Sequence, residues 1–210
     1  MIGIVDYGMG NLMSVYNAFD YLGTDVVICK KPEDLDSVDR IVIPGVGAFK
    51  DCIAKLHSEN FVNELNIQVL QKKKPTLGIC LGMQVMAKIS LEGGKYEGLG
   101  WFDAEVIKLH PHQELGLKIP NIGWNEISYN KSVPLFNNLP ELPDLYLVHS
   151  YYMACNEPEN MVASYEYGHT VTAAVLKDNI FATQFHPEKS QDYGLSILEN
   201  FIKWIPNVKA

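Results

Sequence analysis

A cysteine stands between two glycines in the segment GICLG, residues 78–82. This spacing matches the nucleophile elbow, a sharp strand-to-helix turn that exposes a reactive side chain at its apex. The apolar residues 76–79 suit the strand, and residues 83–91 are expected to follow as a helix. Cys80 is therefore a candidate nucleophile. A buried structural thiol flanked by glycines is the alternative on this motif alone.

A cysteine nucleophile needs a general base and a group that orients the base. His186 has the most suitable setting, because it follows the apolar residues 180–185 and precedes Pro187 and Glu188. In an extended segment, residues two apart project to the same side, so the Glu188 carboxylate can contact the imidazole and set its tautomer. His149, which ends a strongly apolar strand, is the competing candidate.

A Gly-rich turn at Gly45, Val46 and Gly47 follows the strand-like residues 40–44. It lacks the Gly-Lys-Ser/Thr ending of a phosphate-binding loop. Its glycines allow backbone amides to point outward, where they can form an anion nest or an oxyanion hole. An ordinary turn is the alternative.

Another Gly-rich turn contains Gly8 and Gly10, after the apolar residues 2–5. It begins like a dinucleotide-binding fingerprint, but Met13 occupies the third glycine position, and the strand-like residues 26–29 are followed by lysines instead of an acid. We interpret this segment as a tight strand-to-helix turn exposed on a functional face.

Composition limits the class of protein. The chain of 210 residues has 17 Lys and Arg against 25 Asp and Glu, a formal net charge of −8, which disfavours a nucleic-acid partner. No apolar run is long enough for a membrane span, and the N-terminus lacks the basic region of a signal peptide. Four scattered cysteines favour free thiols in a reducing cytoplasm. His110 and His112 have no acidic or cysteine cluster beside them, so no metal site is predicted.

Strand-like and helical segments alternate in the first half of the chain. Strands are expected at 2–5, 26–29, 40–44 and 76–79, and helices at 11–23, 32–38, 60–74 and 83–91. Strands that are apolar on both faces and alternate with helices indicate a mainly parallel sheet flanked by helices. The second half is a series of strand-like segments before a final helix at 190–205, which indicates an antiparallel portion. We predict a single α/β domain over residues 1–210.

The segments PGVG, GICLGMQ and QFHPEKS occur together and in this order. In this respect the chain resembles the class I glutamine amidotransferases. The resemblance implies hydrolysis of L-glutamine to L-glutamate and ammonia by the triad Cys80, His186 and Glu188, without a cofactor. The oxyanion residues that it implies are Gly45, Val46, Gly47 and Leu81. The substrate-binding residues that it implies are Gln84, Glu92, Ser150 and Tyr151. For Glu92, pairing with the ammonium group of glutamine is chemically reasonable, and a solvated residue at a helix end is the alternative.

A narrower resemblance extends over essentially the whole chain. The segments IVDYGMGNL, PGVGAF, GWNEI and LVHSYY are similar to those of the glutaminase subunits of imidazole glycerol phosphate synthases, from histidine biosynthesis. That resemblance implies a heterodimer with a (β/α)8-barrel cyclase, which receives the ammonia and forms imidazole glycerol phosphate and an aminoimidazole carboxamide ribonucleotide. It also implies interface positions at Gly8, Met9, Gly10, Asn11 and Trp124. Core packing is the alternative for Trp124.

One position departs from that pattern, because Asn121 stands where the resemblance predicts a histidine. The departure leaves open a paralogous glutaminase that supplies ammonia to a sugar amidotransferase for surface polysaccharides. Two further hypotheses are a non-catalytic binding subunit that keeps the fold and a hydrolase similar to cysteine peptidases. The intact set of Cys80, His186 and Glu188 disfavours the binding subunit.

Overall fold

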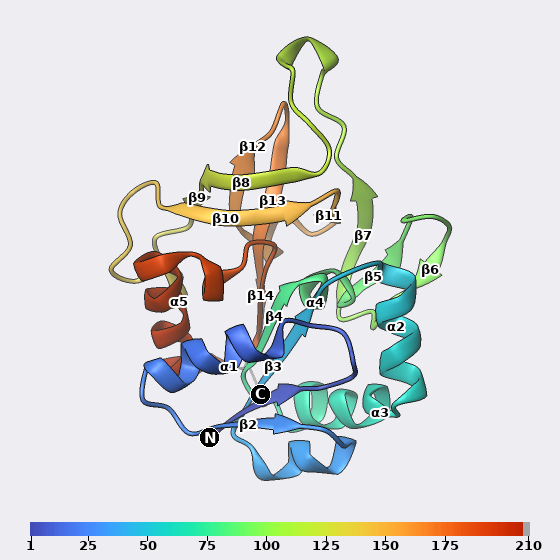
Figure 1. Cartoon of the computed structure of the whole chain (residues 1–210), viewed down its shortest axis with the longest axis vertical. Helices are drawn as coiled ribbons and strands as arrows, with labels where there is room; N and C mark the ends of the chain where they lie inside the picture. The colour runs from blue at the N-terminus through green and yellow to red at the C-terminus, as the bar shows by residue number, and fades with distance from the viewer. Residues whose placement is uncertain (208–210) are drawn as a thin grey trace.

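The computed structural model describes residues 1–207, and its centre is an eight-stranded sheet (Figure 1). The strand order is β2, β1, β3, β4, β14, β13, β12, β9. The bounds are β1 (Ile2–Val5), β2 (Val26–Cys29), β3 (Arg40–Gly45), β4 (Thr76–Cys80), β9 (Ser128–Tyr129), β12 (Met161–Glu166), β13 (Thr170–Lys177) and β14 (Ile180–Thr183). Strands β2, β1, β3, β4 and β14 are parallel, whereas β13, β12 and β9 pair antiparallel. The predicted fold class is confirmed.

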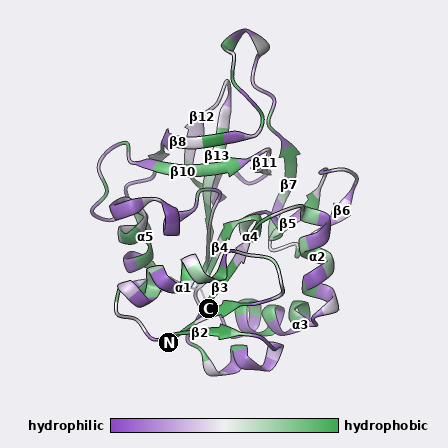
Figure 2. Ribbon diagram, viewed as in Figure 1, coloured by the Kyte–Doolittle hydropathy of each residue, from purple (hydrophilic) through white to green (hydrophobic). Residues whose placement is uncertain are grey.

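Helices cover both faces of this sheet. Helices α1 (Leu12–Tyr21) and α5 (Gln191–Lys203) lie on one face, and α2 (Phe49–Ser58) and α3 (Phe61–Leu65) on the other (Figure 1). The π-helical segment η2 (Asn66–Gln71) continues α3 directly. The strands between these layers are mostly hydrophobic, while the helices carry polar residues as well (Figure 2). This pattern is typical of amphipathic helices that pack on a buried parallel sheet. None of the helices within residues 1–207 is long and apolar enough to cross a membrane.

Two smaller sheets extend the second half of the chain. Strands β8 (Asn121–Glu126) and β10 (Asp144–His149) form an antiparallel pair that lies across the upper end of the main sheet (Figure 1). A four-stranded sheet contains β11 (Tyr151–Cys155), β7 (Phe102–Lys108), β5 (Ala87–Ser90) and β6 (Tyr96–Glu97), in this order. Strand β10 passes into β11 through Ser150 alone, so this one residue links the two smaller sheets.

The helix predicted over residues 83–91 is wrong. Helix α4 comprises only Leu81–Gln84, and the chain then enters strand β5. Strand β5 pairs in parallel with β7 and antiparallel with β6, and these ladders bury Ala87 and Ser90. Pairing with strands distant in the sequence therefore overrides the helical pattern of this segment.

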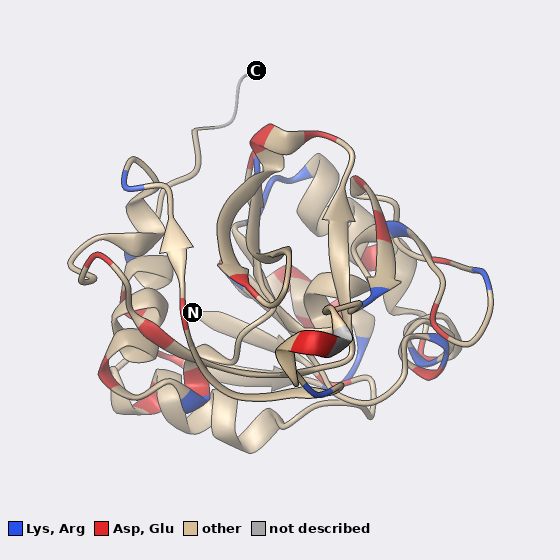
Figure 3. Cartoon of the chain, turned by 90° about the horizontal axis from the view of Figure 1, so that it is seen from above, with Lys and Arg blue, Asp and Glu red and all other residues tan. Residues whose placement is uncertain are grey.

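The remaining short elements connect the strands. They are the 3-10 helices η1 (Pro32–Ser37), η3 (Gln113–Leu115), η4 (Pro134–Phe136), η5 (Pro158–Asn160) and η6 (Pro187–Lys189). Seen from above, Lys and Arg residues are interspersed with Asp and Glu (Figure 3). The short basic run after η2 has partners within the fold. Lys72 pairs with Asp36, and Lys74 donates to the carbonyl of Leu35 at 2.7 Å.

Candidate active site

The turn at the end of β4 has the geometry of a nucleophile elbow. Cys80 has a positive φ of +55° with ψ of −109°, a conformation that residues with a Cβ rarely adopt. A Cβ on Gly82 would lie 1.8 Å from the carbonyl oxygen of Ile43, and one on Gly78 would lie 2.7 Å from the Met86 methyl group. Both glycines are therefore required by close packing between β3, β4 and α4, as the motif predicts.

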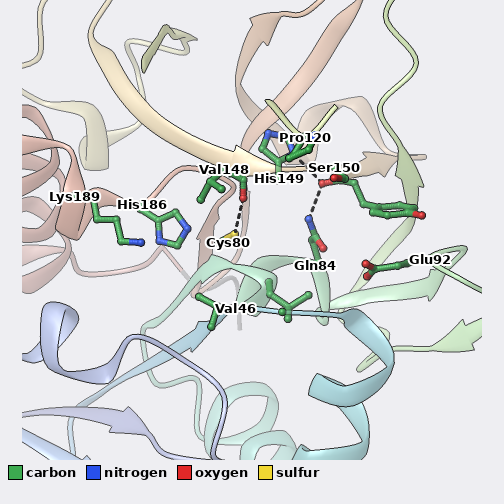
Figure 4. A pocket seen from close by; sticks show the side chains of 13 residues that line it. Val46, Cys80, Gln84, Glu92, Pro120, Val148, His149, Ser150, His186 and Lys189 are labelled. Carbon is green, nitrogen blue, oxygen red and sulfur yellow. Dashed lines mark hydrogen bonds between the residues drawn. The ribbon is translucent and has the colours of Figure 1, made fainter. Parts of the chain in front are cut away.

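Cys80 faces a cavity of about 410 Å³ at the carboxyl ends of the central strands, a size suited to a small molecule (Figure 4). The lining residues are Val46, Gly47, Cys80, Leu81, Gln84, Glu92, Pro120, Val148, His149, Ser150, Tyr151, His186 and Lys189. His186 and Lys189 lie on one side of Cys80, and Gln84 and Glu92 on the other (Figure 4). Although only 7% of the Cys80 surface is exposed, the side chain opens onto this cavity. The thiol is thus both nearly buried and accessible to a ligand.

The predicted contact between His186 and Glu188 is present. Nδ1 of His186 lies 2.7 Å from Oε1 of Glu188, and both side chains are almost fully buried. Pro187–Lys189 is a 3-10 turn and not the extended segment that the sequence predicts, yet it brings the carboxylate to the same ring nitrogen. Because a carboxylate only accepts, Nδ1 carries the hydrogen. Nε2 makes no hydrogen bond of full geometry to a described residue, but it lies close enough to Cys80 to interact with the sulfur and to exchange a proton with it.

Cys80 and Glu188 set the proton affinity of His186. Burial lowers the pKa of the imidazole, but hydrogen bonding and charge from Cys80 and Glu188 outweigh burial and raise it to about 9. A raised pKa means that the imidazole accepts a proton readily, as the general base of a cysteine nucleophile must. The protonated ring can then supply a proton to a leaving group.

A serine that the sequence interpretation missed fixes the loop of the base. Ser190 is buried, its hydroxyl donates to the carbonyl of His186 at 2.7 Å, and it accepts from the amide of Tyr146 at 3.0 Å. The amide of His186 in turn donates to the carbonyl of Tyr146 at 2.9 Å. Strand β10 therefore holds the loop of His186 through two bonds, and the third bond closes the loop on itself. Only the position of Ser190 in QFHPEKS could have indicated this role.

The Gly45-Val46-Gly47 turn lies directly beside the elbow. Val46, Gly47 and Leu81 line the cavity, whereas Gly45 lies behind them, where a Cβ would be 2.7 Å from the amide nitrogen of Gly82. Gly47 has a φ of +101°, which only glycine adopts readily. The turn therefore places backbone next to the sulfur, where amides can stabilise an oxyanion.

Tyr7 anchors this turn from below, a contact that the sequence interpretation did not foresee. The buried Tyr7 hydroxyl donates to the carbonyl of Pro44 at 2.5 Å and lies 3.2 Å from the sulfur of Cys52. Met9 also contacts the turn, since a Cβ on Gly47 would be 3.1 Å from its methyl group. The loop that follows β1 thus touches the turn directly.

Amide and carboxylate side chains form the opposite wall of the cavity. Nε2 of Gln84 donates to the carbonyl of Tyr151 at 2.7 Å and to Oε1 of Gln184 at 2.9 Å. Gln184, which the sequence interpretation also missed, is fully buried, and its Nε2 lies 3.6 Å from the sulfur of Cys80. Glu92 is half-buried at the end of β5 and accepts from the amide of Phe49 at 2.8 Å, so it caps α2 while facing the cavity. The alternative for Glu92, a solvated residue at the end of the predicted helix, is therefore wrong, because the segment before it is strand β5 and its side chain is hydrogen-bonded.

His149, the competing candidate for the base, is held by two other groups. Its Nδ1 lies 2.8 Å from the carbonyl of Tyr151, and its Nε2 lies 2.7 Å from the hydroxyl of Tyr165. Both ring nitrogens are therefore occupied, which leaves His186 as the candidate base. His110 stacks on His169 with ring centroids 4.1 Å apart. Within the described part of the chain, no group of three or more His, Cys, Asp or Glu side chains could hold a metal ion.

The predicted interface positions lie near the surface. Gly8 is exposed, and Met9, Gly10 and Asn11 are partly exposed. Trp124 is 45% exposed and contacts Tyr146 edge to face, so the core-packing alternative is wrong. These positions are accessible at the surface of the chain.

Comparisons with known proteins agree with this geometry. The glutamine amidotransferase class-I family matches residues 3–204. The chain is 48% identical over 203 residues, 97% of its length, to the whole of "Imidazole glycerol phosphate synthase subunit HisH 1" from Campylobacter jejuni strain RM1221. It is 41% identical over 97% of its length to 99% of "Imidazole glycerol phosphate synthase subunit HisH 2" from Methanococcus maripaludis strain S2.

Solved structures share the fold. The crystal structure of a glutamine amidotransferase has a TM-score of 0.72 and 17% identity, covering 95% of this chain and 98% of that one. PurLQS from Thermotoga maritima has a TM-score of 0.74 and 18% identity, covering 96% of this chain and 97% of that one.

Proposed function

This chain belongs to the class I glutamine amidotransferase family, and we propose that it is the glutaminase subunit of an imidazole glycerol phosphate synthase in histidine biosynthesis. It hydrolyses L-glutamine to L-glutamate and ammonia. The observation that carries this proposal is the cavity in which the strained Cys80 meets the buried His186–Glu188 pair. The chain is 41% to 48% identical, over nearly its full length, to relatives named as this subunit, and this similarity supports the pathway.

The first half of the reaction forms a thioester. His186 takes the proton of the Cys80 thiol at Nε2, and the sulfur attacks the side-chain carboxamide carbon of glutamine. The amide oxygen becomes an oxyanion beside the Gly45-Val46-Gly47 turn and the amide of Leu81. His186 then returns its proton to the nitrogen, the C–N bond breaks, and ammonia leaves.

The second half regenerates the enzyme. His186 removes a proton from a water molecule, which attacks the thioester carbon. The C–S bond then breaks as His186 returns the proton to the sulfur, which releases glutamate and restores the thiol. Glu188 keeps the hydrogen on Nδ1 throughout, so Nε2 carries out the proton transfers in both halves of the reaction. Each step moves one proton between His186 and the reacting atoms.

The cavity contains groups suited to the polar end of glutamine. The free oxygen of Glu92 pairs with the ammonium group, while Gln84 and the backbone of Ser150 and Tyr151 bind the remaining polar atoms. A carboxylate that already caps α2 is held in place, so it loses little side-chain freedom when it binds the ligand.

A (β/α)8-barrel cyclase receives the ammonia. The loop of Gly8 to Asn11 and the exposed Trp124 are the proposed contacts with it. Ammonia released into water at neutral pH is mostly protonated and no longer nucleophilic, so a closed route between subunits protects it. The contact between Met9 and Gly47 supports an interface beside the proposed oxyanion turn.

A Cys80→Ala variant of the complex tests the proposal. We expect the variant to lose glutamine hydrolysis, while synthesis from added ammonium salt continues at the wild-type rate. Retained glutaminase activity would show that the nucleophile is another residue. Purification of the native complex tests the pathway, because a partner that consumes a nucleotide sugar would assign the chain to the paralogous route that Asn121 leaves open.

A further inference from the structure

We propose that Asn121, Tyr165 and His149 are positioning residues for glutamine binding, joined in a relay of hydrogen bonds that fixes the cavity wall at Tyr151. This inference rests on the proposed function, because it concerns the same site. All three side chains are buried, and the relay acts on the ligand through the backbone of residues 149–151. Asn121 is also the position at which the sequence departs from its resemblance.

The relay is continuous in the structure. Asn121 is the first residue of β8 and lies opposite His149 in the antiparallel register with β10. Its Nδ2 donates to the Tyr165 hydroxyl at 3.2 Å, and that hydroxyl lies 2.7 Å from Nε2 of His149. Nδ1 of His149 lies 2.8 Å from the carbonyl oxygen of Tyr151. Three strands, β8, β12 and β10, are thereby tied to the first residue of β11.

The donor and acceptor of each bond in the relay follow from the carbonyl of Tyr151 at one end and the amide of Asn121 at the other. The carbonyl of Tyr151 only accepts, so Nδ1 of His149 carries the hydrogen. Burial lowers the pKa of His149 to about 4, so the ring is neutral near pH 7 and its Nε2 accepts from Tyr165. The oxygen of Tyr165 is then free to accept from Asn121. An amide at position 121 supplies the donor that this order requires.

The far end of the relay reaches the glutamine site. The same carbonyl of Tyr151 also accepts from Gln84, which contacts Gln184 next to the sulfur of Cys80. Ser150 and Tyr151 line the cavity, and the carbonyl of Ser150 is held by the amide of Leu109 at 2.9 Å. The relay therefore restrains the cavity wall formed by Ser150 and Tyr151, where a small shift of the backbone changes the fit of the ligand.

A tyrosine-to-phenylalanine pair tests the relay in the complex with the cyclase subunit. Tyr165→Phe leaves Nε2 of His149 without a donor, whereas Tyr129→Phe removes a hydroxyl that bonds only to the carbonyls of Leu139 and Pro140. We expect Tyr165→Phe to raise the KM for glutamine about tenfold, a change of about 1.4 kcal/mol, with kcat within about twofold of wild type. The matched Tyr129→Phe variant should keep both constants. Alkylation of Cys80 by iodoacetamide should proceed at the same rate in both.

A second variant, Asn121→Asp, keeps the volume of the side chain but replaces its donor by an acceptor and adds a negative charge. A carboxylate accepts the proton of Tyr165 and so withdraws it from His149, and we expect the same rise in KM. This variant decides the matter if Tyr165→Phe does not fold. A KM in the folded relay variants equal to that of Tyr129→Phe, or a loss confined to kcat, would overturn the relay. An absence of glutaminase activity in the wild-type complex would instead overturn the proposed function.

Discussion

The strained backbone of Cys80 predicts that glycine at this position is more stabilising than alanine, the reverse of the usual order. With φ of +55° and ψ of −109°, Cys80 lies outside the regions that residues with a Cβ favour. Holding such a residue there costs about 1–3 kcal/mol, while glycine in a folded chain costs about 0.5–1 kcal/mol through the greater freedom of its unfolded state. We therefore expect Cys80→Gly to be more stable than Cys80→Ala by about 1 kcal/mol.

The assay is urea unfolding of the two variants at 25 °C, with the free energy of unfolding extrapolated to water. A control pair at Cys52 makes the comparison specific. Cys52 is fully buried inside α2, where glycine is unfavourable, so Cys52→Gly should be less stable than Cys52→Ala by about 1 kcal/mol. Because each pair compares glycine with alanine after loss of a buried sulfur, opposite signs isolate the backbone conformation. If Cys80→Gly unfolds at the same or a lower urea concentration than Cys80→Ala, the elbow is not strained.

Three other predictions concern the base, the oxyanion turn and the interface. The pKa of His186 rises on folding from 6.5 to about 9, so the folded chain binds this proton more tightly; up to about 3 kcal/mol of stability is present below pH 6.5 and is lost as the pH rises through 9. Urea unfolding at pH 6 and pH 10 should show this loss in wild type and not in His186→Asn. Tyr7→Phe releases the carbonyl of Pro44 and should lower kcat about tenfold with little change in KM; a rise in KM alone would contradict this role. Trp124→Ala should change the free energy of unfolding of the isolated chain by no more than about 1 kcal/mol and weaken the complex about thirtyfold in a titration with the cyclase subunit; unchanged affinity would place Trp124 outside the interface.

The parts of the site that depend on local conformation are predictable from the sequence. The elbow needs glycines at fixed distances from Cys80, because backbone atoms of β3 occupy the space of a side chain at Gly82, while Met86, Ala182 and the Gly82 carbonyl crowd Gly78. His186 and Glu188 are two residues apart, so their contact depends on a single short turn. The sequence also predicts helix α1, because its apolar residues follow helical spacing. The helix ends just before Gly23, whose φ of +72° suits glycine at a helix C-terminus.

The parts that depend on contacts between distant segments are not predictable in this way. Tyr7 reaches Pro44, and Gln184 reaches both Gln84 and Cys80, only after the sheet has assembled. Gln184 is the first residue of QFHPEKS, but nothing in that segment indicates that its side chain reaches Gln84 and Cys80. The failed helix at β5 has the same origin, because β7 supplies the pairing that decides its conformation.

The strand that leads to the base is the last strand within residues 1–207, yet it occupies an interior place in the sheet. Strand β14 lies between β4 and β13, so the antiparallel portion joins the parallel portion only through it. A ribosome delivers the chain from its N-terminus, so Cys80 emerges long before Ile180 begins this strand. A nascent or truncated chain that ends before Ile180 holds a thiol without its base and a main sheet in two pieces. If His186 is the base, as proposed, chains that end before Ile180 lack glutaminase activity.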